Sequence, residues 1–483
     1  MVPRLPLVLT SSLSLVACAT PTPYTPPLTE LPSAYRNTAV LESASRVVAP
    51  ADDGWWAAFG DPVLDRLVQE SLAGSLDVEA ASARLQQAAA ASRVARSAQL
   101  PSGVVGGSAG VQRQSLNEPT ARIASALPGY DRTSEAYGLN AAASWEIDLF
   151  GRLAAARRAA GADEASAAAG VAGARLTVAA EVATAYIGAR ELQRRIEIAR
   201  ERARTLAELD RLVRLRVQEG AAAQLEAEQV EADLAATRAR IPALEAALAA
   251  TFNRIDVLAG RAPGRAEAEL GGGRLPSAAS VAVADGPADL LRRRPDIIAA
   301  ERRVAAADAR TAQALADYYP RVNVGGLFGL VATGGAGLFT SEALQASGSA
   351  GFSGRLFDFG AVRGGVEAAR GRTREAVADY RATVLRAVAE VEDSLSLLSR
   401  RSRQAQDLEA SEAALGRARD LSKLAYEGGA VSLIEALDAE RRLLEVQDAA
   451  TTVRADAARA TVSLSRALGG GWQASPAVAA TRS

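Results

Sequence analysis

Residues 135–149 read EAYGLNAAASWEIDL, and apolar and polar side chains alternate along this stretch. A period of two is that of a β-strand with one apolar and one polar face. Phe150 and Gly151 follow directly, and residues 152–218 then contain no proline. The stretch therefore predicts a strand that turns sharply into a helix roughly 100 Å long, because each helical residue adds about 1.5 Å.

The same succession of strands and helices occurs twice along the chain. Asp77 and Pro101 recur as Asp296 and Pro320, both 219 positions later. Phe150-Gly151 recurs 209 positions later as Phe359-Gly360. Glu219-Gly220 recurs at the same offset as Gly428-Gly429. The change of offset falls between the two strands of each pair, so the first hairpin loop is expected to be longer. A duplicated unit of strands and long helices predicts a symmetric tube.

The repeat also predicts boundaries. A first repeat over 53–260 and a second over 288–469 are joined by a linker over 261–287, and a tail over 470–483 ends the chain. The expected strands cover about 102–112, 135–149, 321–331 and 346–358, and the expected long helices about 151–218, 221–260, 361–427 and 430–468. Pro242 is expected to interrupt the second of these helices, since a proline lacks the backbone N–H of a helical residue.

The four expected strands are amphipathic segments of about ten residues. Such segments are typical of transmembrane β-strands, although a half-buried sheet of a soluble protein gives the same pattern. Four strands are too few to close a barrel, and open edges are not tolerated in hydrocarbon. If these strands lie in a membrane, several chains must share one barrel, and three chains would supply twelve strands.

The long helices carry a coiled-coil pattern. Apolar residues in the first helix are spaced by three and four, and charged residues such as Arg194 and Arg195 fill its other faces. The seam consists of Val182, Ala185, Ala189, Leu192, Ile196, Ala199, Ala203 and Leu206. Each half is therefore expected to form a helical hairpin with a glycine turn at its tip. A soluble coiled-coil scaffold would explain the helices but not the strands or the duplication.

The composition excludes much of the usual chemistry of enzymes. The chain has 55 basic and 56 acidic residues and no histidine. Lys423, Cys18 and Met1 are the only residues of their types. Histidine bases, most metal sites and intrachain disulfides are therefore excluded, and we expect no catalysis, no cofactor, no metal and no nucleic-acid partner.

The N-terminus is expected to be a signal peptide over 1–17 followed by a tether over 18–52. Arg4 precedes a short apolar run that ends in Leu15-Val-Ala-Cys18. This run is too short to span a bilayer, and the tetrapeptide resembles a bacterial lipobox, in which the cysteine is lipidated. Ala19 differs from the aspartate that usually retains lipoproteins at the inner membrane. Cys18 is therefore expected to anchor the chain to outer-membrane lipid.

Several motifs together resemble the TolC-like outer membrane factors, specifically the NodT/OprM-type efflux lipoproteins. The segments that carry the resemblance are Leu290-Leu-Arg-Arg-Arg-Pro-Asp296, Asp317-Tyr-Tyr-Pro-Arg321, Trp145-Glu-Ile-Asp-Leu-Phe-Gly-Arg152, Phe357-Asp-Phe-Gly360, Ile241-Pro-Ala-Leu-Glu245, Tyr426-Glu-Gly-Gly429 and Leu468-Gly-Gly-Gly-Trp472. Pro295 also suits the first turn of a helix, and Asp296 complements its dipole. A nucleic-acid patch is the alternative reading of Arg292 to Arg294.

The resemblance implies a mainly α-helical chain with membrane β-strands. Three copies would form a twelve-stranded outer-membrane β-barrel, continued by a long periplasmic α-helical barrel with 261–287 in its equatorial region. The resemblance places an acidic constriction at Glu435 and Asp438 near the periplasmic tip, with Tyr426 beside it. In the first repeat the matching positions are Glu226 and Gln229. The latch arginine of some relatives corresponds to Val431, so the latch is expected to differ here.

The function implied is that of the outer membrane channel of a tripartite efflux pump, a passive duct for small molecules. Its partners would be two further copies of the chain, a periplasmic adaptor, or membrane fusion protein, and an inner-membrane RND-type pump. The adaptor would contact the tips near Gly220, Gly428 and Gly429. Two alternatives remain open at this point, a channel for type I protein secretion and a lipid-anchored periplasmic scaffold without a pore.

Overall fold

The computed structural model describes residues 24–37, 54–277 and 286–470. Cys18 and the predicted signal peptide lie outside the described residues. The chain divides into two compact units, and the first is built mainly from residues 86–164 and 302–378. The second contains most of the remaining helices. Each unit thus takes segments from both repeats, because equivalent elements of the two repeats pack together instead of forming separate halves.

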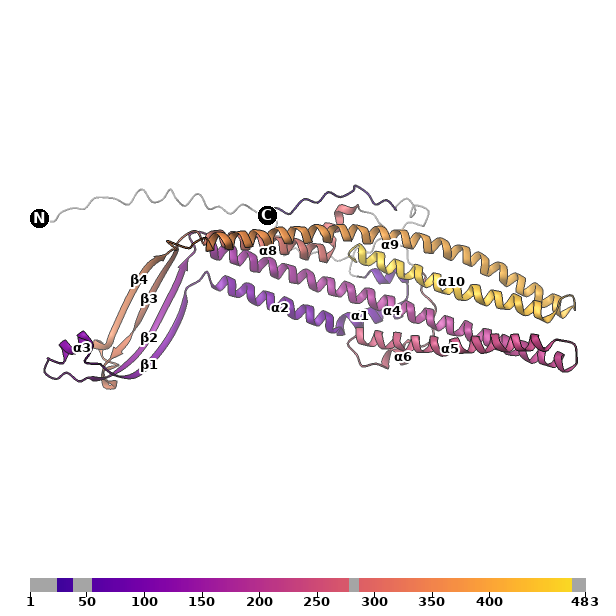
Figure 1. Ribbon diagram of the computed structural model, residues 1–483, viewed down its shortest axis with the longest axis horizontal. Coiled ribbons are helices and arrows are strands. Elements are labelled where there is room, and N and C mark those ends of the chain that lie inside the picture. The colour runs from indigo at the N-terminus through magenta and orange to yellow at the C-terminus, as the bar shows by residue number, and fades with distance from the viewer. Residues whose placement is uncertain (1–23, 38–53, 278–285, 471–483) are drawn as a thin grey trace. The chain divides into compact units, whose positions relative to one another are not determined.

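Four strands form a single antiparallel sheet in the first unit (Figure 1). They are β1 (Ser102–Arg113), β2 (Thr133–Ile147), β3 (Arg321–Ala332) and β4 (Leu344–Ser353), and they lie in chain order across the sheet. β2 and β3 pair over eleven positions from Tyr137 opposite Ala332 to Ile147 opposite Val322. The last strand of the first repeat is therefore hydrogen-bonded to the first strand of the second.

β4 ends five residues earlier than the predicted 346–358. Its last residue, Ser353, faces Arg321, the first residue of β3. Residues 354–358 thus have no strand beside them within the described chain with which to form a ladder. The alternation of side chains predicted a longer strand because it reports which face is apolar and not whether a partner strand is present.

The two hairpin loops differ in length, as predicted. The first covers 114–132 and contains the short helix α3 (Pro119–Ala124), whereas the second covers 333–343. The glycine cluster beginning at Gly334 lies in the second loop, where residues 335–337 form a single 3-10 turn.

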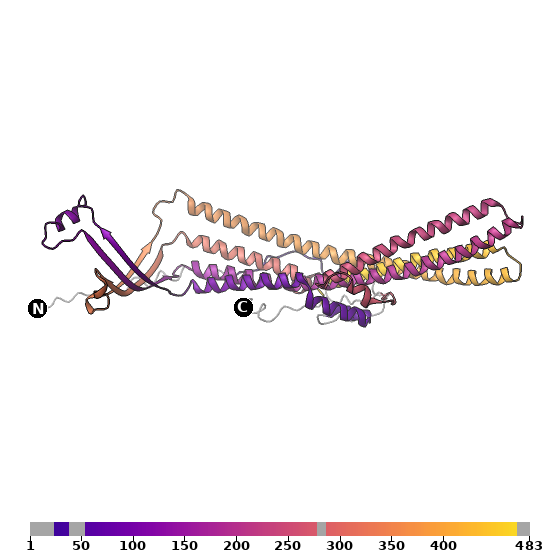
Figure 2. The same ribbon diagram turned by 90° about the horizontal axis from the view of Figure 1, so that it is seen from below.

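The helices of the two repeats match in length and spacing. α2 (Leu76–Ser97) and α8 (Pro295–Ala316) have 22 residues each and start 219 positions apart. The other pairs, 209 positions apart, are α4 (Arg152–Gln218) with α9 (Ala361–Glu427), 67 residues each, and α5 (Gln224–Leu258) with α10 (Leu433–Ala467), 35 residues each. The α4–α5 and α9–α10 hairpins and their turns are visible in Figure 2.

The prediction that Pro242 interrupts its helix is wrong. α5 runs without a break from Gln224 to Leu258 with Pro242 inside it. A proline removes only one helical hydrogen bond and can be accommodated when the flanking turns are held by packing. Leu234 before it and Phe252 and Ile255 after it are buried, so both parts of the helix are held against neighbours.

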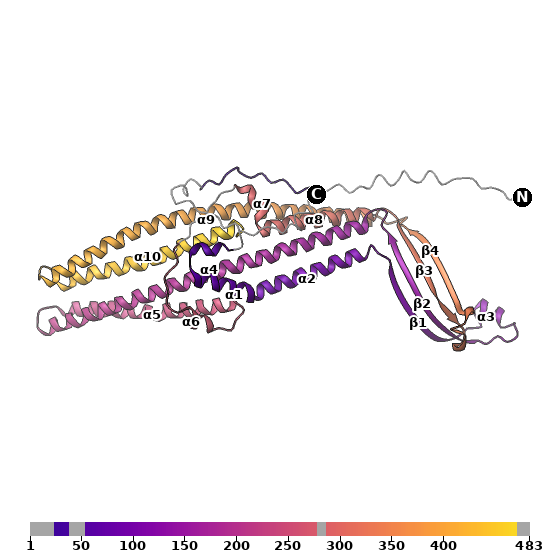
Figure 3. The same cartoon turned by 180° about the vertical axis from the view of Figure 1, so that it is seen from behind.

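The core of the second unit forms around the middle of α4. The short helix α1 (Pro62–Gly74) begins at Asp61, whose carboxylate accepts hydrogen bonds from the backbone N–H groups of Val63 and Leu64. Figure 3 shows α1 and α6 (Arg265–Leu270) from behind. The side chains that meet in this core include Trp55, Leu64, Val68, Val182, Tyr186, Ile187, Ile255 and Val462. Every residue of the predicted seam is buried or partly buried.

Asp256 attaches the linker to this core. Its side chain is fully buried, and its carboxylate accepts hydrogen bonds from the backbone N–H groups of Gly264, Arg265 and Ala266 at 2.9 to 3.1 Å. The carboxylate thus satisfies the free N–H groups at the start of α6.

Among the described residues, no helix combines the length and the apolar character needed to cross a membrane.

Candidate functional site

The tips of the two helical hairpins are built alike. Gly220 and Gly429 have φ angles of 74° and 73°, in the left-handed region that favours glycine. The N–H of Ala221 donates to the carbonyl of Arg216 at 2.7 Å, and the N–H of Ala430 donates to that of Ala425 at 2.8 Å. This is the 6→1 bond that closes a helix ending in a left-handed glycine. Gly428 makes an ordinary helical bond to Leu424, so Gly429 supplies the reversal.

The return helices begin differently in the two hairpins. Ser432 and Glu435 form a capping box, in which each side chain binds the backbone N–H of the other residue, at 3.3 and 2.7 Å. At the matching position of the first repeat, Ala223 provides no side-chain cap. Glu435, one of the predicted gate residues, therefore holds the first turn of its own helix and stays exposed.

Asp438, the second predicted gate carboxylate, lies one turn further along α10. It forms ion pairs with Arg441 and Arg442, both at 2.7 Å. The Arg441 hydrogen bond, together with the charges of both guanidinium groups, lowers the pKa of Asp438 below its usual range. Arg441 in turn binds Glu445 at 2.8 Å, so Asp438 belongs to a row of alternating charges along α10.

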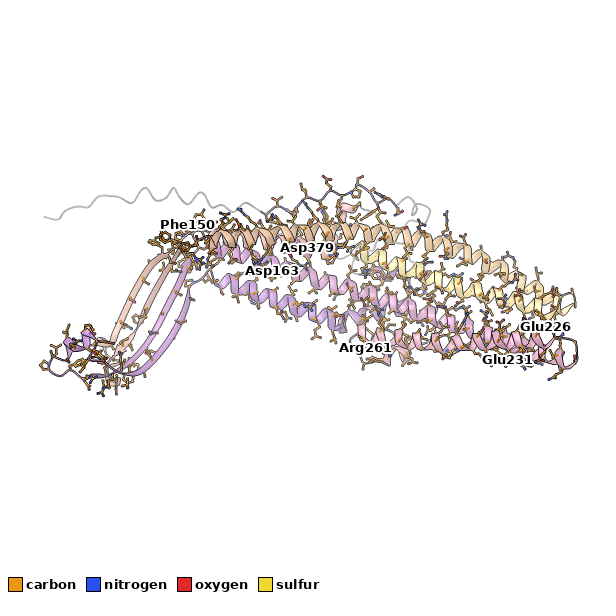
Figure 4. The ribbon with its side chains drawn as sticks, in the orientation of Figure 1. Phe150, Asp163, Glu226, Glu231, Arg261 and Asp379 are labelled. Atoms are coloured by element: carbon orange, nitrogen blue, oxygen red, sulfur yellow. The ribbon has the colours of Figure 1, made fainter. Side chains whose placement is uncertain are left out.

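The first hairpin presents a different set of charges at its tip. Glu226, which matches Glu435 in the repeat, and Glu231 lie near the turn between α4 and α5 (Figure 4). Glu231 is paired with Arg214 of α4, which also binds Asp210 at 2.9 Å. Tyr426 lies in the last turn of α9 and is 40% exposed. The structure thus brings Glu435, Asp438 and Tyr426 to one hairpin tip, whereas Gly220 belongs to the other.

A row of ion pairs joins α4 of the first repeat to α10 of the second. Arg195 binds Asp448 at 2.8 Å, Arg202 binds Glu445 at 3.3 Å, and Arg459 of α10 binds Glu191 at 2.7 Å. We define these three contacts as the in-chain seam. The hydrogen bond to Asp448 raises the pKa of Arg195 above its usual range.

The sequence analysis placed Arg195 on a helix face outside the apolar seam, and the structure shows that this face meets α10. The spacing of Glu191, Arg195 and Arg202 by four and seven is a sign of one shared helix face. This spacing could have pointed to the contact, but it could not have identified the partner helix.

The arginine-proline motif has a structural role inside the second unit. The Arg294 side chain is 9% exposed and binds Asp296 at 2.7 Å and Glu390 of α9 at 2.8 Å. Arg294 also donates to the carbonyl of Ala467, at the end of α10. One guanidinium thus ties together the start of α8, the middle of α9 and the end of α10, which leaves no role for Arg294 in a nucleic-acid patch.

Each of the two repeats of this chain matches the model of a known protein family. The family model described as outer membrane efflux protein matches residues 67–261 and 286–470, one match for each of the two repeats. The chain belongs to the outer membrane efflux protein family.

Individual members of the outer membrane efflux protein family resemble this chain over nearly its whole length. The pyoverdine export outer membrane protein OpmQ of Pseudomonas putida is 33% identical, with 98% of each chain covered. Nodulation protein T of Rhizobium leguminosarum bv. trifolii is 28% identical over 95% of this chain and 96% of its own length. A solved structure of the outer-membrane channel OprN is 31% identical with a TM-score of 0.83, covering 95% of this chain and all of that one.

These similarities confirm the family, the fold class and the outer-membrane efflux function that the sequence predicted. As a member of the family, this outer membrane efflux protein acts at the outer membrane as part of an efflux system. The assignment of Glu435, Asp438 and Tyr426 to a gate, and of Cys18 to lipidation, stays a prediction.

Within the described residues, no group of three or more acidic residues is arranged to hold a metal ion.

Proposed function

We propose that three copies of this chain form the outer membrane channel of a tripartite efflux pump, through which small molecules pass passively to the outside. The observation that carries this proposal is the architecture of one copy, which has two matched helical hairpins and a sheet whose two outer strands each leave one edge without a partner strand. Three copies supply twelve strands and six hairpins, enough for a closed barrel and a helical tube.

The cargo is expected to be chosen by the pump and not by the duct. The names of the relatives mention pyoverdine export in two Pseudomonas species and toluene efflux in Pseudomonas putida. Relatives of one fold are thus named for different compounds, which supports a wide duct that recognises little. An inner-membrane RND-type pump would therefore provide both the driving force and the selectivity.

The hairpin tips are the proposed contact for the periplasmic adaptor. Leu421 and Leu424 near the end of α9 and Leu225 at the start of α5 are each about two-thirds exposed. Exposed apolar side chains next to a turn suit a protein partner, because burying them removes apolar surface from water. Binding of the adaptor would shift the tips from a closed to an open arrangement.

Glu435 and Asp438 are the proposed constriction of the closed duct. In a threefold assembly each becomes a ring of three carboxylates, which favours cations over anions. Asp438 is already balanced by two arginines, so replacing it frees Arg441 and Arg442 as well as removing a negative charge. Both changes act in the same direction on a permeating ion.

The test is conductance of the purified, assembled protein in planar lipid bilayers. Glu435→Gln with Asp438→Asn should raise the conductance and weaken the preference for cations by about fivefold, which corresponds to ~1 kcal/mol for the lost charge interactions. Glu226→Gln, at the matching position of the first repeat, is the control and should leave the cation preference unchanged.

Two results would contradict these proposals. An unaltered cation preference in the double variant, with pores present, removes these residues from the constriction. A correctly assembled protein that conducts neither as wild type nor as the double variant argues against a channel altogether.

A further inference from the structure

Three helices of the second unit border a hollow of about 580 Å³. It lies between α4 and α5 of the first hairpin and α10 of the second, and its lining includes Arg195, Arg202, Glu445 and Asp448 of the in-chain seam. Sites for small organic molecules typically have volumes of about 300 to 1,000 Å³. The hollow is therefore large enough for such a molecule.

Apolar side chains form the buried part of the lining. Ile198 of α4 and Leu444 of α10 are 3% and 2% exposed, and Leu244 of α5 is partly buried. Ala199 and Ala243 also line the hollow, and their methyl groups are too short to fill it. An apolar group that enters from water would be removed from water here, which favours binding.

The charged part of the lining has a positive sum, because three arginines face two carboxylates. Arg195 binds Asp448 at 2.8 Å, so this pair is balanced within the chain. Arg240 of α5 is exposed and forms no ion pair with any residue of the described chain. The hollow thus offers a free guanidinium to an anion.

Arg202 is a second guanidinium with little compensation from the chain. Its side chain is 19% exposed, and its ion pair with Glu445 is 3.3 Å long. Glu445 is shared with Arg441, which lies closer, at 2.8 Å. The Nε atom of Arg202 is buried and has no hydrogen-bond partner among the described residues. A buried donor without an acceptor is unfavourable, so an acceptor that enters the hollow would be bound firmly.

We propose that this hollow binds a small amphipathic organic anion. Its carboxylate accepts hydrogen bonds from Arg202 and Arg240, and its apolar body packs on Ile198, Leu244 and Leu444. Hydrogen bonds between charged groups are the strong ones, and the two guanidinium groups come from different helices. The bound anion contacts both hairpins and stabilises their contact. This site goes beyond the proposed channel function and does not depend on it.

The second hairpin shows that the packing of such a hairpin does not need these arginines. α9 and α10 have the same lengths as α4 and α5. The residues 209 positions after Arg195, Arg202 and Arg240 are Gln404, Ser411 and Ala449, all of them neutral. The three guanidinium groups are therefore a property of the hollow and not of the repeated fold.

Binding of naphthoate to the full-length protein in lipid nanodiscs tests the proposal. Naphthylmethylammonium and naphthalenemethanol have the same aromatic body with a cationic and a neutral head. Isothermal titration calorimetry should show that naphthoate binds about tenfold more tightly than either, and that its binding weakens as salt is added. Empty nanodiscs control for partition into the lipid.

Substitutions of arginine test the polar half of the site. Arg202→Gln should weaken naphthoate binding about tenfold, because a charged donor is lost. Arg204→Gln is the matched control, since Arg204 lies two positions further along α4 and outside the lining of this hollow. It should leave the affinity unchanged.

Substitutions of alanine test the hollow itself with every arginine in place. Ala243→Phe should fill the space and abolish binding. Ala246→Phe, about one turn further along α5 and outside the lining, should bind naphthoate like the wild type. Both alanines are exposed, so neither change should prevent folding, and thermal unfolding without the probe checks this.

Four results would each overturn the proposal. They are equal affinity for naphthoate and naphthalenemethanol, equal losses in Arg202→Gln and Arg204→Gln, full affinity in folded Ala243→Phe, and no binding to the wild type, which would show that the hollow holds water only. None of these measurements depends on conductance, so a failure of the proposed channel would leave the site standing, and a failure of the site would leave the channel standing.

Discussion

At the scale of single residues, buried polar side chains hold the helices to the linker. The hydroxyl of Tyr186 donates to the carboxylate of Asp61 at 2.6 Å, and the Arg190 guanidinium lies 4.9 Å from the centre of the Tyr186 ring. Arg190 also donates to the carbonyls of Leu270 and Gly271, both at 2.9 Å. A Cβ atom at Gly273 would collide with this guanidinium, so the linker closes tightly over it. These contacts fix the linker on α4.

Burial and the bond to Asp61 raise the pKa of Tyr186 from 10.0 to about 12. Because the folded state favours the protonated phenol, the resulting stabilisation is complete below pH 10 and is lost as the pH rises towards 12. Absorbance at 295 nm should show one tyrosine of the folded protein ionising near pH 12. This late step should disappear in Tyr186→Phe and in denaturant. Its persistence in Tyr186→Phe would show that another tyrosine is responsible.

At the scale of elements, the two return helices differ in how they begin. α10 has the capping box of Ser432 and Glu435, whereas α5 begins after Ala223 without a side-chain cap. A side-chain cap is typically worth about 1 kcal/mol of helix stability. The second hairpin, which carries the proposed constriction, is thus expected to have the more firmly ordered first turn after its tip.

Exchanging the caps tests this difference. Ser432→Ala should destabilise the first turn of α10 by about 1 kcal/mol and increase amide hydrogen exchange there about fivefold. Ala223→Ser should slow exchange in the first turn of α5, and each hairpin serves as the internal control for the other. Hydrogen exchange followed by mass spectrometry measures both. Equal exchange at the two starts in the wild type would contradict the expectation.

At the scale of the whole molecule, the repeats meet in two chemically different ways. The in-chain seam holds three ion pairs between α4 and α10. The repeat equivalents of Arg195 and Asp448 are Gln404 and Ala239, which cannot form such a pair. In the proposed assembly of three copies, these equivalents would lie between neighbouring chains. The ionic connection therefore joins the two hairpins of one chain, and the proposed contact between chains would lack the Arg195–Asp448 pair.

A double-mutant cycle measures this connection. Arg195→Ala and Asp448→Ala should show a coupling energy below about 1 kcal/mol at low salt, because both side chains are partly exposed, and the coupling should shrink as salt is added. Thermal unfolding of the assembled protein is the measurement. Gln404→Ala, at the equivalent position of the second repeat, should show no such salt dependence. Coupling of equal size at high salt would contradict an ionic origin.

The sequence by itself determined the repeat, the four strands, the long helices and the glycine turns. These features depend on periodicity and on local backbone preference, which a few neighbouring residues carry. The tertiary structure alone decided that Arg195 faces α10, that Arg294 is buried among three helices, that Asp256 caps α6 and that β4 ends at Ser353. Each of these depends on a partner far away in the chain, or on the absence of one, and neither periodicity nor composition records which distant residues meet.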